Sequence, residues 1–388
     1  MIIEPRIREN VCLNAHPQGC FRQVEAQIDY VMARDRIRSP RRVLVIGSSN
    51  GYGLAARIVS AFGSGAATIG LAYERPAKGK RAASAGWYNN EAFTTLARDH
   101  GHPVWNVNGD AFADQIKAQV LGSIRENLGQ IDLLVYSIAA PRRLDPQTGE
   151  LYSSVIRPIG RPFRAKTVDF QTGEVRVETC EPATAEQTAQ TIKVMGGEDW
   201  SLWVERLLEA GLLAEGFQTV AFSYIGPEVT RPIYRDGTIG MAKQDLEQHA
   251  GSINGMLAGL SGRAVVSVQK ALVTRASAVI PAVPLYVSLL YKVMKAKGLH
   301  ENCIQQIYRL YHDFLFSPQP AATDELGRLR LDDWEMRDDV QHEVAELWQR
   351  VDSDNIRQLA DLDGFREEFL RHHGFGVPGI DYSREVTP

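Results

Sequence analysis

Three tyrosine–lysine pairs have spacings that suit hydride-transfer chemistry. Tyr234 and Lys243 lie nine positions apart, Tyr286 and Lys295 repeat that spacing, and Tyr291 lies four positions before Lys295. A reductase that uses no metal needs a group that stabilises the negative charge developing on the substrate oxygen. A tyrosine hydroxyl can do this when a nearby lysine lowers its pKa and holds the cofactor ribose. Spacing alone does not decide among the three pairs.

A glycine-rich loop, G-x-x-x-G-x-G, runs from Gly47 to Gly53, between an apolar segment and a helical pattern. Glycines allow a tight turn and let backbone N–H groups approach a pyrophosphate, and the following helix N-terminus adds a favourable dipole. A Walker P-loop is excluded because the loop has no G-K-[ST]. The pattern therefore predicts a dinucleotide site formed by Gly47, Ser48, Ser49, Asn50, Gly51 and Tyr52.

Tyr73 and Glu74 end the second apolar segment. An acidic residue at this position typically accepts hydrogen bonds from the adenosine ribose, and it would repel a 2′-phosphate. Glu74 therefore favours NADH over NADPH. The opposite preference stays open, because nearby cations could bind that phosphate. These cations are Arg75, Lys78, Lys80 and Arg81.

Two further segment ends complete the expected cofactor site. Asp110 and Ala111 follow the third apolar segment, where this class of fold places a side chain against the adenine edge. Ile138 and Ala139 end the fourth segment, where small residues let the backbone pass the cofactor. Their regular placement is what makes each of them a candidate.

The apolar periodicity indicates the scaffold that positions these residues. Short apolar runs alternate with helical patterns such as Leu54, Ile58 and Phe62. Such alternation implies right-handed β-α-β units, so we expect an α/β fold with a Rossmann-like, doubly wound parallel sheet. The expected strands are 42–47, 67–73, 103–107, 131–137, 219–224 and 264–268.

The order of these segments favours one tyrosine–lysine pair. In this class of fold the catalytic pair lies between the fifth and sixth strands, because that crossover helix runs beside the nicotinamide. Tyr234 and Lys243 lie there, whereas Tyr291 and Lys295 follow the sixth strand in an apolar run. Tyr224, at the end of the fifth strand, is a candidate for a second hydroxyl that faces the substrate.

The chain shows no flexible linker, so we expect one large domain over residues 1–388. The strand–helix alternation breaks after Ala140, which indicates an insertion over 141–217 between the fourth and fifth strands. Residues 281–388 read as a mainly helical region that covers the substrate and extends the C-terminus, starting at the proline-rich segment around Pro281.

Composition narrows the class of protein. The 388 residues carry 43 Lys and Arg against 47 Asp and Glu, a net charge of −4, which argues against a nucleic-acid binder. The four cysteines form no C-x-x-C pair, so we expect no metal or redox site. Neither a signal-peptide pattern nor an apolar run of about 18 residues occurs. We therefore expect a cytoplasmic protein that does not insert into membranes.

These residues and the stretches around them resemble the trans-2-enoyl-CoA/enoyl-ACP reductases of the FabV type, relatives of the short-chain dehydrogenases. The resemblance covers nearly the whole chain and does not depend on a single motif. The matching stretches are RVLVIGSSNGYGLAARI, GWYN, NGDAF, LVYSIAAPRR, VMGGEDW, GLLAEG, the segment from Tyr234 to Lys243, VSVQKALVTRASAVIPAVPLYVSLLYKVMK, DNIRQLADLDGF and GFGVPGIDY.

The resemblance implies an NADH-dependent reductase of the 2,3-double bond in enoyl thioesters carried by acyl carrier protein or CoA, acting in fatty acid biosynthesis as a monomer. It implies that Tyr234 is the proton donor, that Lys243 binds cofactor and that Tyr224 contacts substrate. It places the nicotinamide end of the cofactor against Leu272, Val273 and Thr274. Hydride would pass to the β-carbon, and Lys243 would favour the tyrosinate form of Tyr234.

Two other hypotheses remain open from the residues alone. One is a short-chain-type carbonyl dehydrogenase that uses Tyr291 and Lys295. The other is a non-catalytic NAD-binding regulator, which would keep the glycine loop but would not need a tyrosine–lysine pair.

Residues 141–166 form a basic segment in this mildly acidic chain. CoA and the prosthetic arm of acyl carrier protein both carry phosphate, and acyl carrier protein is acidic. The segment leaves the sheet at the edge where ligands bind in open α/β folds, so its cations are candidates for carrier contacts, with a solvated loop as the alternative. The cations are Arg142, Arg143, Arg157, Arg161, Arg164 and Lys166, opposed by Asp145 and Glu150.

Overall fold

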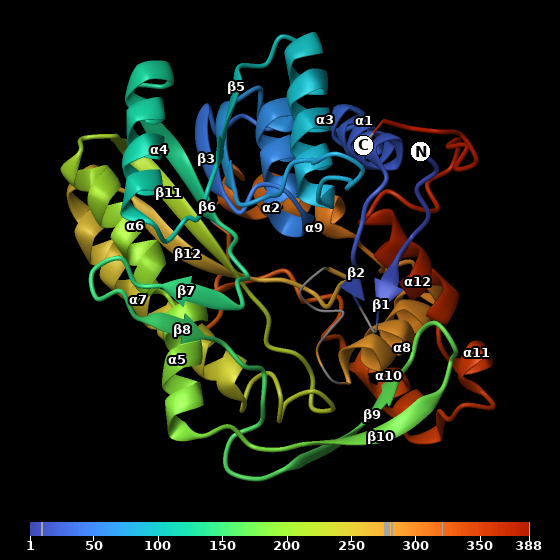
Figure 1. Cartoon of the computed structure of the whole chain (residues 1–388). Coiled ribbons are helices and arrows are strands. Elements are labelled where there is room, and N and C mark those ends of the chain that lie inside the picture. Colours follow the sequence, from blue (N-terminus) through green and yellow to red (C-terminus); the bar gives the residue numbers. More distant parts are fainter. Residues whose placement is uncertain (9–10, 275–279, 281, 320, 388) are drawn as a thin grey trace.

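A parallel sheet forms the centre of the protein. The computed structural model describes residues 1–8, 11–274, 280, 282–319 and 321–387. In this part of the chain the sheet has seven strands in the order β13-β12-β11-β6-β3-β4-β5, and its neighbouring strands pair in parallel (Figure 1). The strands are β3 (Arg42–Ile46), β4 (Ala67–Ala72), β5 (Val104–Asn108), β6 (Ile131–Tyr136), β11 (Leu213–Ser223), β12 (Arg263–Val268) and β13 (Leu329–Arg330).

The strand order reverses direction between β3 and β6. From β3 the chain moves outward through β4 and β5, then returns to place β6 on the other side of β3, with Val43 opposite Leu133 and Ile46 opposite Tyr136. Ligands bind at such a switch point, outside the carboxyl ends of the strands. The predicted Rossmann-like, doubly wound sheet is confirmed, and β13 adds a short seventh strand at one edge.

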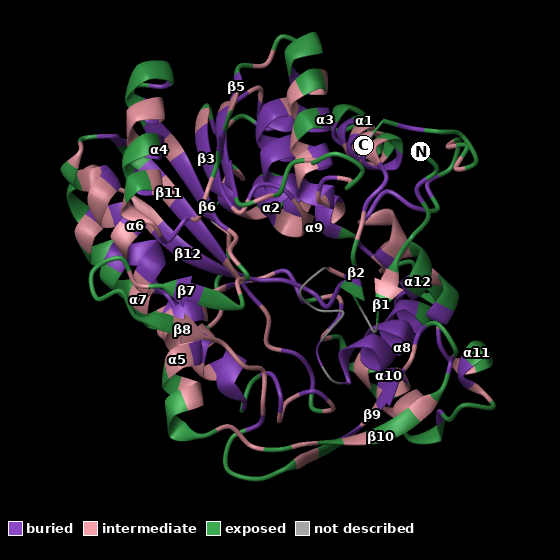
Figure 2. Cartoon of the chain, in the orientation of Figure 1, coloured by how far each residue is buried: buried purple, intermediate pink, exposed green. Residues whose placement is uncertain are grey.

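Helices cover both faces of the sheet, and the alternation of side chains along each strand explains why. Val43 and Val45 of β3 join one buried apolar cluster, whereas Leu44 and Ile46 join another. The first cluster includes residues of α2 (Gly51–Ile58) and α3 (Ala85–Asp99), and the second includes residues of α4 (Asp114–Asn127), α6 (Glu198–Glu209) and α7 (Thr238–Leu257). Figure 2 shows the strands buried between these layers.

Residues 141–217 contain two hairpins followed by two helices. The hairpins are β7 (Arg142–Leu144) with β8 (Leu151–Ser153), and β9 (Phe163–Val168) with β10 (Val175–Cys180); α5 (Ala185–Met195) and α6 follow. The β9–β10 hairpin reaches α10 (Asp338–Arg350), where the ammonium of Lys166 donates to the carbonyl oxygens of Trp348, Gln349 and Val351, each at 2.9 Å. This long hairpin therefore ties the middle of the chain to the C-terminal helices (Figure 1).

The C-terminal region is mainly helical, and the two ends of the chain meet. Met1 donates through its terminal amine to the carbonyl of Val386, at 2.9 Å. Short strands β1 (Ile7–Arg8) and β2 (Val11–Cys12) and helix α1 (Pro17–Met32) precede the sheet. The C-terminal helices are α8 (Val283–Ala296), α9 (Cys303–Arg309), α10, α11 (Ile356–Leu359) and α12 (Leu362–Arg371). Among the described helices, none combines the length and the apolar character that crossing a membrane requires.

Candidate active site

The glycine loop lies between β3 and α2, at the carboxyl end of the sheet. Gly47 has φ +85°, and a Cβ there would lie 2.0 Å from the carbonyl oxygen of Ser137. A Cβ on Gly53 would lie 2.0 Å from the carbonyl oxygen of Gly47. The backbone thus requires glycine at both positions. The side chain of Asn50, the N-cap residue of α2, makes no capping bond, so the N-terminus of α2 can face a cofactor phosphate.

Glu74 lies against this loop. Its carboxylate accepts hydrogen bonds from Ser49 Oγ at 2.8 Å and from Asn50 Nδ2 at 3.1 Å. Asn89, on α3, donates to the carbonyl oxygen of Ser49 and to Oδ1 of Asn50, both at 3.0 Å. Asn89 was not predicted as a site residue, although it belongs to the GWYN stretch. Tyr73 is 78% exposed.

The buried ion pair of Lys117 and Asp199 holds the loop that carries Asp110 and Ala111. Lys117 Nζ donates to the carbonyl oxygen of Ala111 at 2.7 Å and to Asp199 Oδ1 at 2.6 Å. Tyr136 donates to the other oxygen of Asp199 at 3.0 Å. Burial lowers the pKa of Lys117 and raises that of Asp199. This buried pair therefore connects the expected adenine loop to β6 and α6.

A cavity of about 210 Å³ opens at the carboxyl ends of β6, β11 and β12. It brings together eight of the predicted site residues: Tyr52, Ile138, Ala139, Tyr224, Tyr234, Lys243, Leu272 and Thr274. Gly47–Gly51, Tyr73, Glu74, Asp110, Ala111 and Val273 do not line it. The first nine of these ten belong to the strand ends and loops expected at the adenosine and pyrophosphate end. Apart from Tyr52, the two groups therefore divide along the length expected for a dinucleotide.

Tyr234 and Lys243 both line the cavity, on either side of the start of α7. Tyr234 is 6% exposed, and burial raises the pKa of its hydroxyl, with a further contribution from the charge of Glu335. Lys243 Nζ donates to the carbonyl oxygen of Phe222 at 2.9 Å, and burial lowers its pKa to about 8. Burial thus favours the protonated form of Tyr234 in this structure, and the role of Lys243 toward the tyrosinate stays a prediction.

The competing pair lies outside the cavity. Tyr291 is 0% exposed; its hydroxyl donates to Glu368 and accepts from the backbone N–H of Val273 at 3.1 Å. Lys295 Nζ donates to Asp361 Oδ2 at 2.5 Å. Both side chains are committed to structural contacts and neither lines the cavity. The structure therefore contradicts the hypothesis of a carbonyl dehydrogenase that uses Tyr291 and Lys295.

Val273 presents its backbone away from the cavity, because its N–H faces Tyr291 and its carbonyl oxygen lies 2.7 Å from His372 Nε2. Three polar residues that the sequence analysis missed do line the cavity: Ser223, Gln269 and Lys270. Within the described residues, Ser223 Oγ and Gln269 Oε1 are buried without a hydrogen-bond partner. Ser223 ends β11 and Gln269 follows β12, and their unused hydrogen-bonding capacity is available to a ligand.

Part of the apolar lining comes from outside the core sheet. Ile156 and Met195 belong to residues 141–217, and Ile280 and Val283 precede or begin α8. Pro281 and residues 275–279 lie outside the described residues. Among the described side chains, no group of three His, Cys, Asp or Glu is arranged to hold a metal ion.

The sheet topology, the glycine loop and a buried tyrosine–lysine pair beside it define a dinucleotide-dependent oxidoreductase. Three family models match the chain: the catalytic region of trans-2-enoyl-CoA reductase over residues 81–316, its NAD(P)H binding domain over 2–79, and an enoyl reductase FAD binding domain over 323–386. The chain belongs to the trans-2-enoyl-CoA reductase family.

Full-length relatives agree with this assignment. The chain is 53% identical to the NADH-dependent enoyl-[acyl-carrier-protein] reductase of Opitutus terrae, covering 100% of this chain and 99% of that one. It is 51% identical to the NADH-dependent trans-2-enoyl-CoA reductase of Clostridium perfringens, covering 100% and 99%. The crystal structure of the Treponema denticola trans-2-enoyl-CoA reductase in complex with NAD superposes with a TM-score of 0.97 at 50% identity, covering 100% and 98%. The Clostridium acetobutulicum enzyme in complex with NADH gives 0.98 at 45%, with the same coverage.

The description of residues 323–386 as an FAD binding domain does not fit the side chains found there. Val340, Val344 and Phe365 of this region are buried in the main apolar cluster, and none of its described residues lines the cavity above. A hollow near the chain ends is lined by apolar residues together with Glu4, Gly376, Tyr382 and Ser383, without a cation to receive a flavin pyrophosphate. We therefore derive no flavin chemistry from this region.

Proposed function

We propose that this protein is an NADH-dependent reductase of the 2,3-double bond of trans-2-enoyl thioesters, carried by acyl carrier protein or CoA, in fatty acid biosynthesis. The observation that carries the proposal is a single cavity lined by Tyr234, Lys243 and Tyr224 at the carboxyl edge of the sheet, next to the glycine loop. The full-length relatives named above are NADH-dependent enoyl thioester reductases, which supports the same activity here.

The chain's own residues hold the cofactor. NADH, when bound, supplies the hydride that the β-carbon receives. Residues 47–52 would present backbone N–H groups to its pyrophosphate, and Glu74 would accept from the adenosine ribose. Asp110 and Ala111 would face the adenine. Ile138, Ala139 and Leu272–Thr274 would bracket the nicotinamide end.

Tyr234 and Lys243 act on the substrate side. Negative charge develops on the thioester oxygen as the β-carbon gains hydride, and the protonated hydroxyl of Tyr234 donates to that oxygen. A proton must also reach the α-carbon to complete the saturated product. Lys243 donates to the carbonyl of Phe222 and would bind the cofactor ribose as a cation.

The acyl chain needs an apolar cover. Ile156 and Met195 from the insertion at 141–217, with Ile280 and Val283 near the start of the region at 281–388, provide one. We assign both regions to covering the substrate. We propose a monomer as the functional unit, as the family resemblance implies, and light scattering of the purified protein tests it.

The decisive assay follows NADH absorbance with purified protein and crotonyl-CoA, then with a crotonyl-carrier-protein conjugate. We expect NADH consumption that depends on the enoyl thioester, with one saturated thioester formed per NADH. Acetoacetyl-CoA serves as the carbonyl control and should not be reduced. Reduction of the ketone but not of the enoyl thioester would contradict the proposal.

A further inference from the structure

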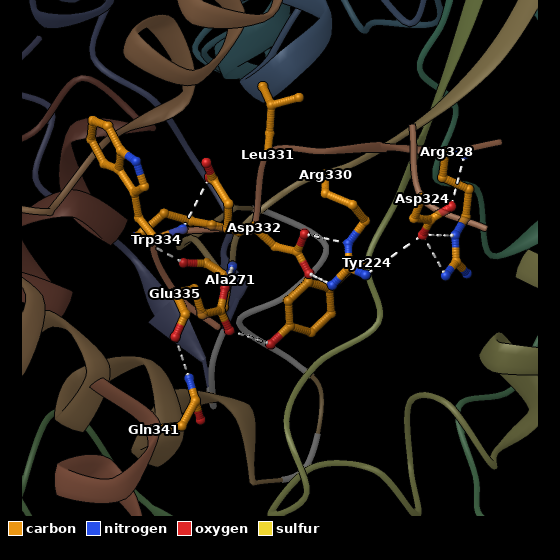
Figure 3. A network of polar contacts seen from close by, with 12 residues as sticks. Tyr224, Ala271, Asp324, Arg328, Arg330, Leu331, Asp332, Trp334, Glu335 and Gln341 are labelled. Carbon is orange, nitrogen blue, oxygen red and sulfur yellow. Dashed lines mark hydrogen bonds and ion pairs between the residues drawn. The ribbon is translucent and has the colours of Figure 1, made fainter. Parts of the chain in front are cut away.

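A carboxylate from the C-terminal region lies beside the cavity. Glu335 follows β13 and is 0% exposed. Its Oε1 accepts hydrogen bonds from the hydroxyls of Tyr224 at 2.9 Å and Tyr286 at 2.6 Å, and its Oε2 accepts from the backbone N–H of Ala271 at 2.6 Å. Tyr224, Tyr286 and Ala271 all line the cavity. Figure 3 shows the Tyr224 hydroxyl pointing directly at this carboxylate.

The position of Glu335 is fixed from several sides. Gln341 Nε2 donates to the carbonyl oxygen of Glu335 at 2.6 Å and to the hydroxyl of Tyr286 at 3.2 Å. Just before it, Arg330 forms two hydrogen bonds of 2.7 Å with Asp332 (Figure 3). Gln341 thus holds the backbone at Glu335, while the hydrogen bonds from Tyr224, Tyr286 and Ala271 hold its carboxylate.

A second set of contacts ties this segment to the helix that carries Lys243. Arg328 NH1 donates to Glu247 Oε1 at 2.9 Å, and Arg328 Nε donates to Asp324 Oδ2 at 2.8 Å. Glu247 lies one turn after Lys243 on α7. These bonds therefore fix the segment that carries Glu335 relative to the helix that carries Lys243.

The hydrogen bonds to Glu335 determine whether Tyr224 and Tyr286 can donate to, or only accept from, a molecule in the cavity. A tyrosine hydroxyl has one proton, and a carboxylate only accepts. Since Tyr224 donates its proton to Glu335, its oxygen can only accept from a molecule in the cavity. Tyr286 donates to the same carboxylate and accepts from Gln341, so both functions of that hydroxyl are used.

Tyr234 is in a different situation. Its ring meets the ring of Tyr224 edge to face, with 4.7 Å between centroids and 81° between planes. Within the described residues, no side chain or backbone group forms a hydrogen bond with its hydroxyl, and burial keeps that hydroxyl protonated. Its proton is therefore not committed to the protein.

We propose that Glu335 is a positioning residue that fixes the proton of Tyr224 away from the substrate, so that Tyr224 acts as a hydrogen-bond acceptor and Tyr234 alone donates to the thioester oxygen. This inference rests on the proposed reductase function. It changes the role of Tyr224 from a second donor, which would stabilise the enolate, to a group that orients a donor on the substrate or on the cofactor.

The charges around Glu335 are consistent with a carboxylate. Burial raises its pKa, but the hydrogen bonds from Tyr286 and Ala271 and the charge of Lys270 favour the ionised form. Lys270 is 2% exposed and donates to the carbonyl of Ala271 at 3.2 Å. The charge of Asp332 acts in the other direction and raises the pKa of Glu335, but the ion pair of Asp332 with Arg330 reduces this effect.

Glu335→Gln reverses these hydrogen bonds without changing the size of the side chain. The N–H of Ala271 needs the amide oxygen, so the NH₂ group replaces Oε1, where Tyr224 and Tyr286 converge. Both tyrosine oxygens then accept, and the proton of Tyr224 turns toward the cavity. The freed hydroxyl can replace the missing donor when Tyr234 is changed to Phe.

The test compares kcat with crotonyl-CoA in the wild type, Tyr234→Phe, Tyr234→Phe/Glu335→Gln, and the triple variant that adds Tyr224→Phe. We expect Tyr234→Phe to lose about 100-fold, the double variant to recover on the order of tenfold, and the triple variant to lose that recovery. A double variant no faster than Tyr234→Phe would overturn the inference. NADH binding, measured by fluorescence, checks that each variant is folded.

A second measurement covers the case in which the Glu335→Gln variants do not fold. Tyr224→Phe should raise KM for the thioester more than it lowers kcat, and it should retain the wild-type solvent isotope effect on kcat. A loss of kcat as large as that of Tyr234→Phe would make Tyr224 a donor and overturn the inference. Wild-type protein that consumes no NADH with enoyl thioesters would instead reject the proposed function, and the inference with it.

Discussion

Lys243 donates a hydrogen bond of 2.9 Å to the main-chain carbonyl of Phe222, at the carboxyl end of β11. Burial lowers the pKa of this lysine to about 8. Because the proposed role needs the cation, activity should be full below this pKa and fall as pH rises through about 8. We expect kcat/KM for NADH, which reports the free enzyme, to show this alkaline limb.

Lys270 is the necessary control, because burial also lowers its pKa to about 8 and it lines the same cavity. Arginine stays charged throughout this range. Lys243→Arg should therefore remove the alkaline limb, although the overall rate will fall, whereas Lys270→Arg should keep it. The reverse pattern would assign the limb to Lys270.

Tyr234 and Tyr291 should respond differently to loss of the hydroxyl. Tyr234→Phe should lower kcat by about 100-fold or more, because it removes the proton donor, while the Kd for NADH stays near the wild-type value. Tyr291→Phe should keep most of kcat but lower the free energy of unfolding by about 1–3 kcal/mol, because Val273 N–H and Glu368 lose a buried partner. Steady-state kinetics and urea unfolding of the two variants provide the comparison. A larger loss of kcat in Tyr291→Phe than in Tyr234→Phe would show that Tyr291 is the catalytic tyrosine.

Glu74 should control the choice of cofactor. Glu74→Ala removes a charge that would face a 2′-phosphate, so the ratio of kcat/KM for NADPH to that for NADH should rise by roughly tenfold or more. The KM for NADH should rise as well, because Ser49 and Asn50 lose their acceptor. Arg75→Ala is the matched control. If wild-type protein prefers NADPH and Arg75→Ala abolishes that preference, the basic residues control selection instead.

The sheet was predictable because its strands carry strong local signals. Residues 43–46 are apolar on both faces, are followed by a required glycine and precede a helical pattern, and short apolar runs followed by helical patterns recur along the first half of the chain. β13 lacks any such signal, since two residues, Leu329 and Arg330, pair with β12 only through the tertiary fold. The two hairpins between residues 142 and 180 were missed because arginines and turn residues obscure their alternation.

The site residues also fall into those that the sequence could predict and those that it could not. Tyr234 and Lys243 were predictable because strand order places the fifth crossover beside the nicotinamide. Glu335 was not, because it stands in the acidic stretch DDWEMRDD, which reads as a solvated surface, and it reaches Tyr224 from 111 positions away. Lys117 and Asp199 were also missed, because they are far apart in the sequence and meet only in the folded chain. Each looks like an ordinary charged residue on a helix until the fold buries the two together.

The buried pair of Lys117 and Asp199 leads to a stability prediction. Lys117→Met leaves the carboxylate of Asp199 buried without its cation, which should cost about 3–5 kcal/mol of unfolding free energy. Lys117→Met/Asp199→Asn removes both charges and should cost less than the sum of the single changes. Urea unfolding measures all three variants. Additive losses would show that the two charges do not interact.

Removing Lys117 should also weaken cofactor binding, since Lys117 holds the carbonyl of Ala111. We expect a higher Kd for NADH in Lys117→Met at temperatures where the variant is folded. KM for the enoyl thioester, measured at saturating NADH, should change much less. Equal changes in both constants would indicate a general loss of structure.

The last prediction concerns the basic segment of residues 141–166. Two of its cations are already used by the protein, because Arg143 is buried and donates to Glu198 at 2.8 Å, and Lys166 binds the carbonyls at the end of α10. The remaining arginines, 142, 157, 161 and 164, are exposed or half-buried. Of the four, Arg157 directly follows the cavity residue Ile156. These arginines are therefore the ones available to a carrier's phosphates or acidic face.

Arg157→Glu/Arg161→Glu/Arg164→Glu should raise KM for CoA- and carrier-linked substrates by roughly tenfold at low salt, and that increase should shrink as salt screens the charges. KM for NADH should not change. An N-acetylcysteamine thioester, which lacks the carrier's phosphates, should show no such increase. The exposed arginines at positions 38, 98 and 125 provide a control with the same change in net charge elsewhere on the surface. Unchanged KM for both carriers would show that the arginines only solvate a loop, whereas an equal increase in the control would indicate an effect of net charge.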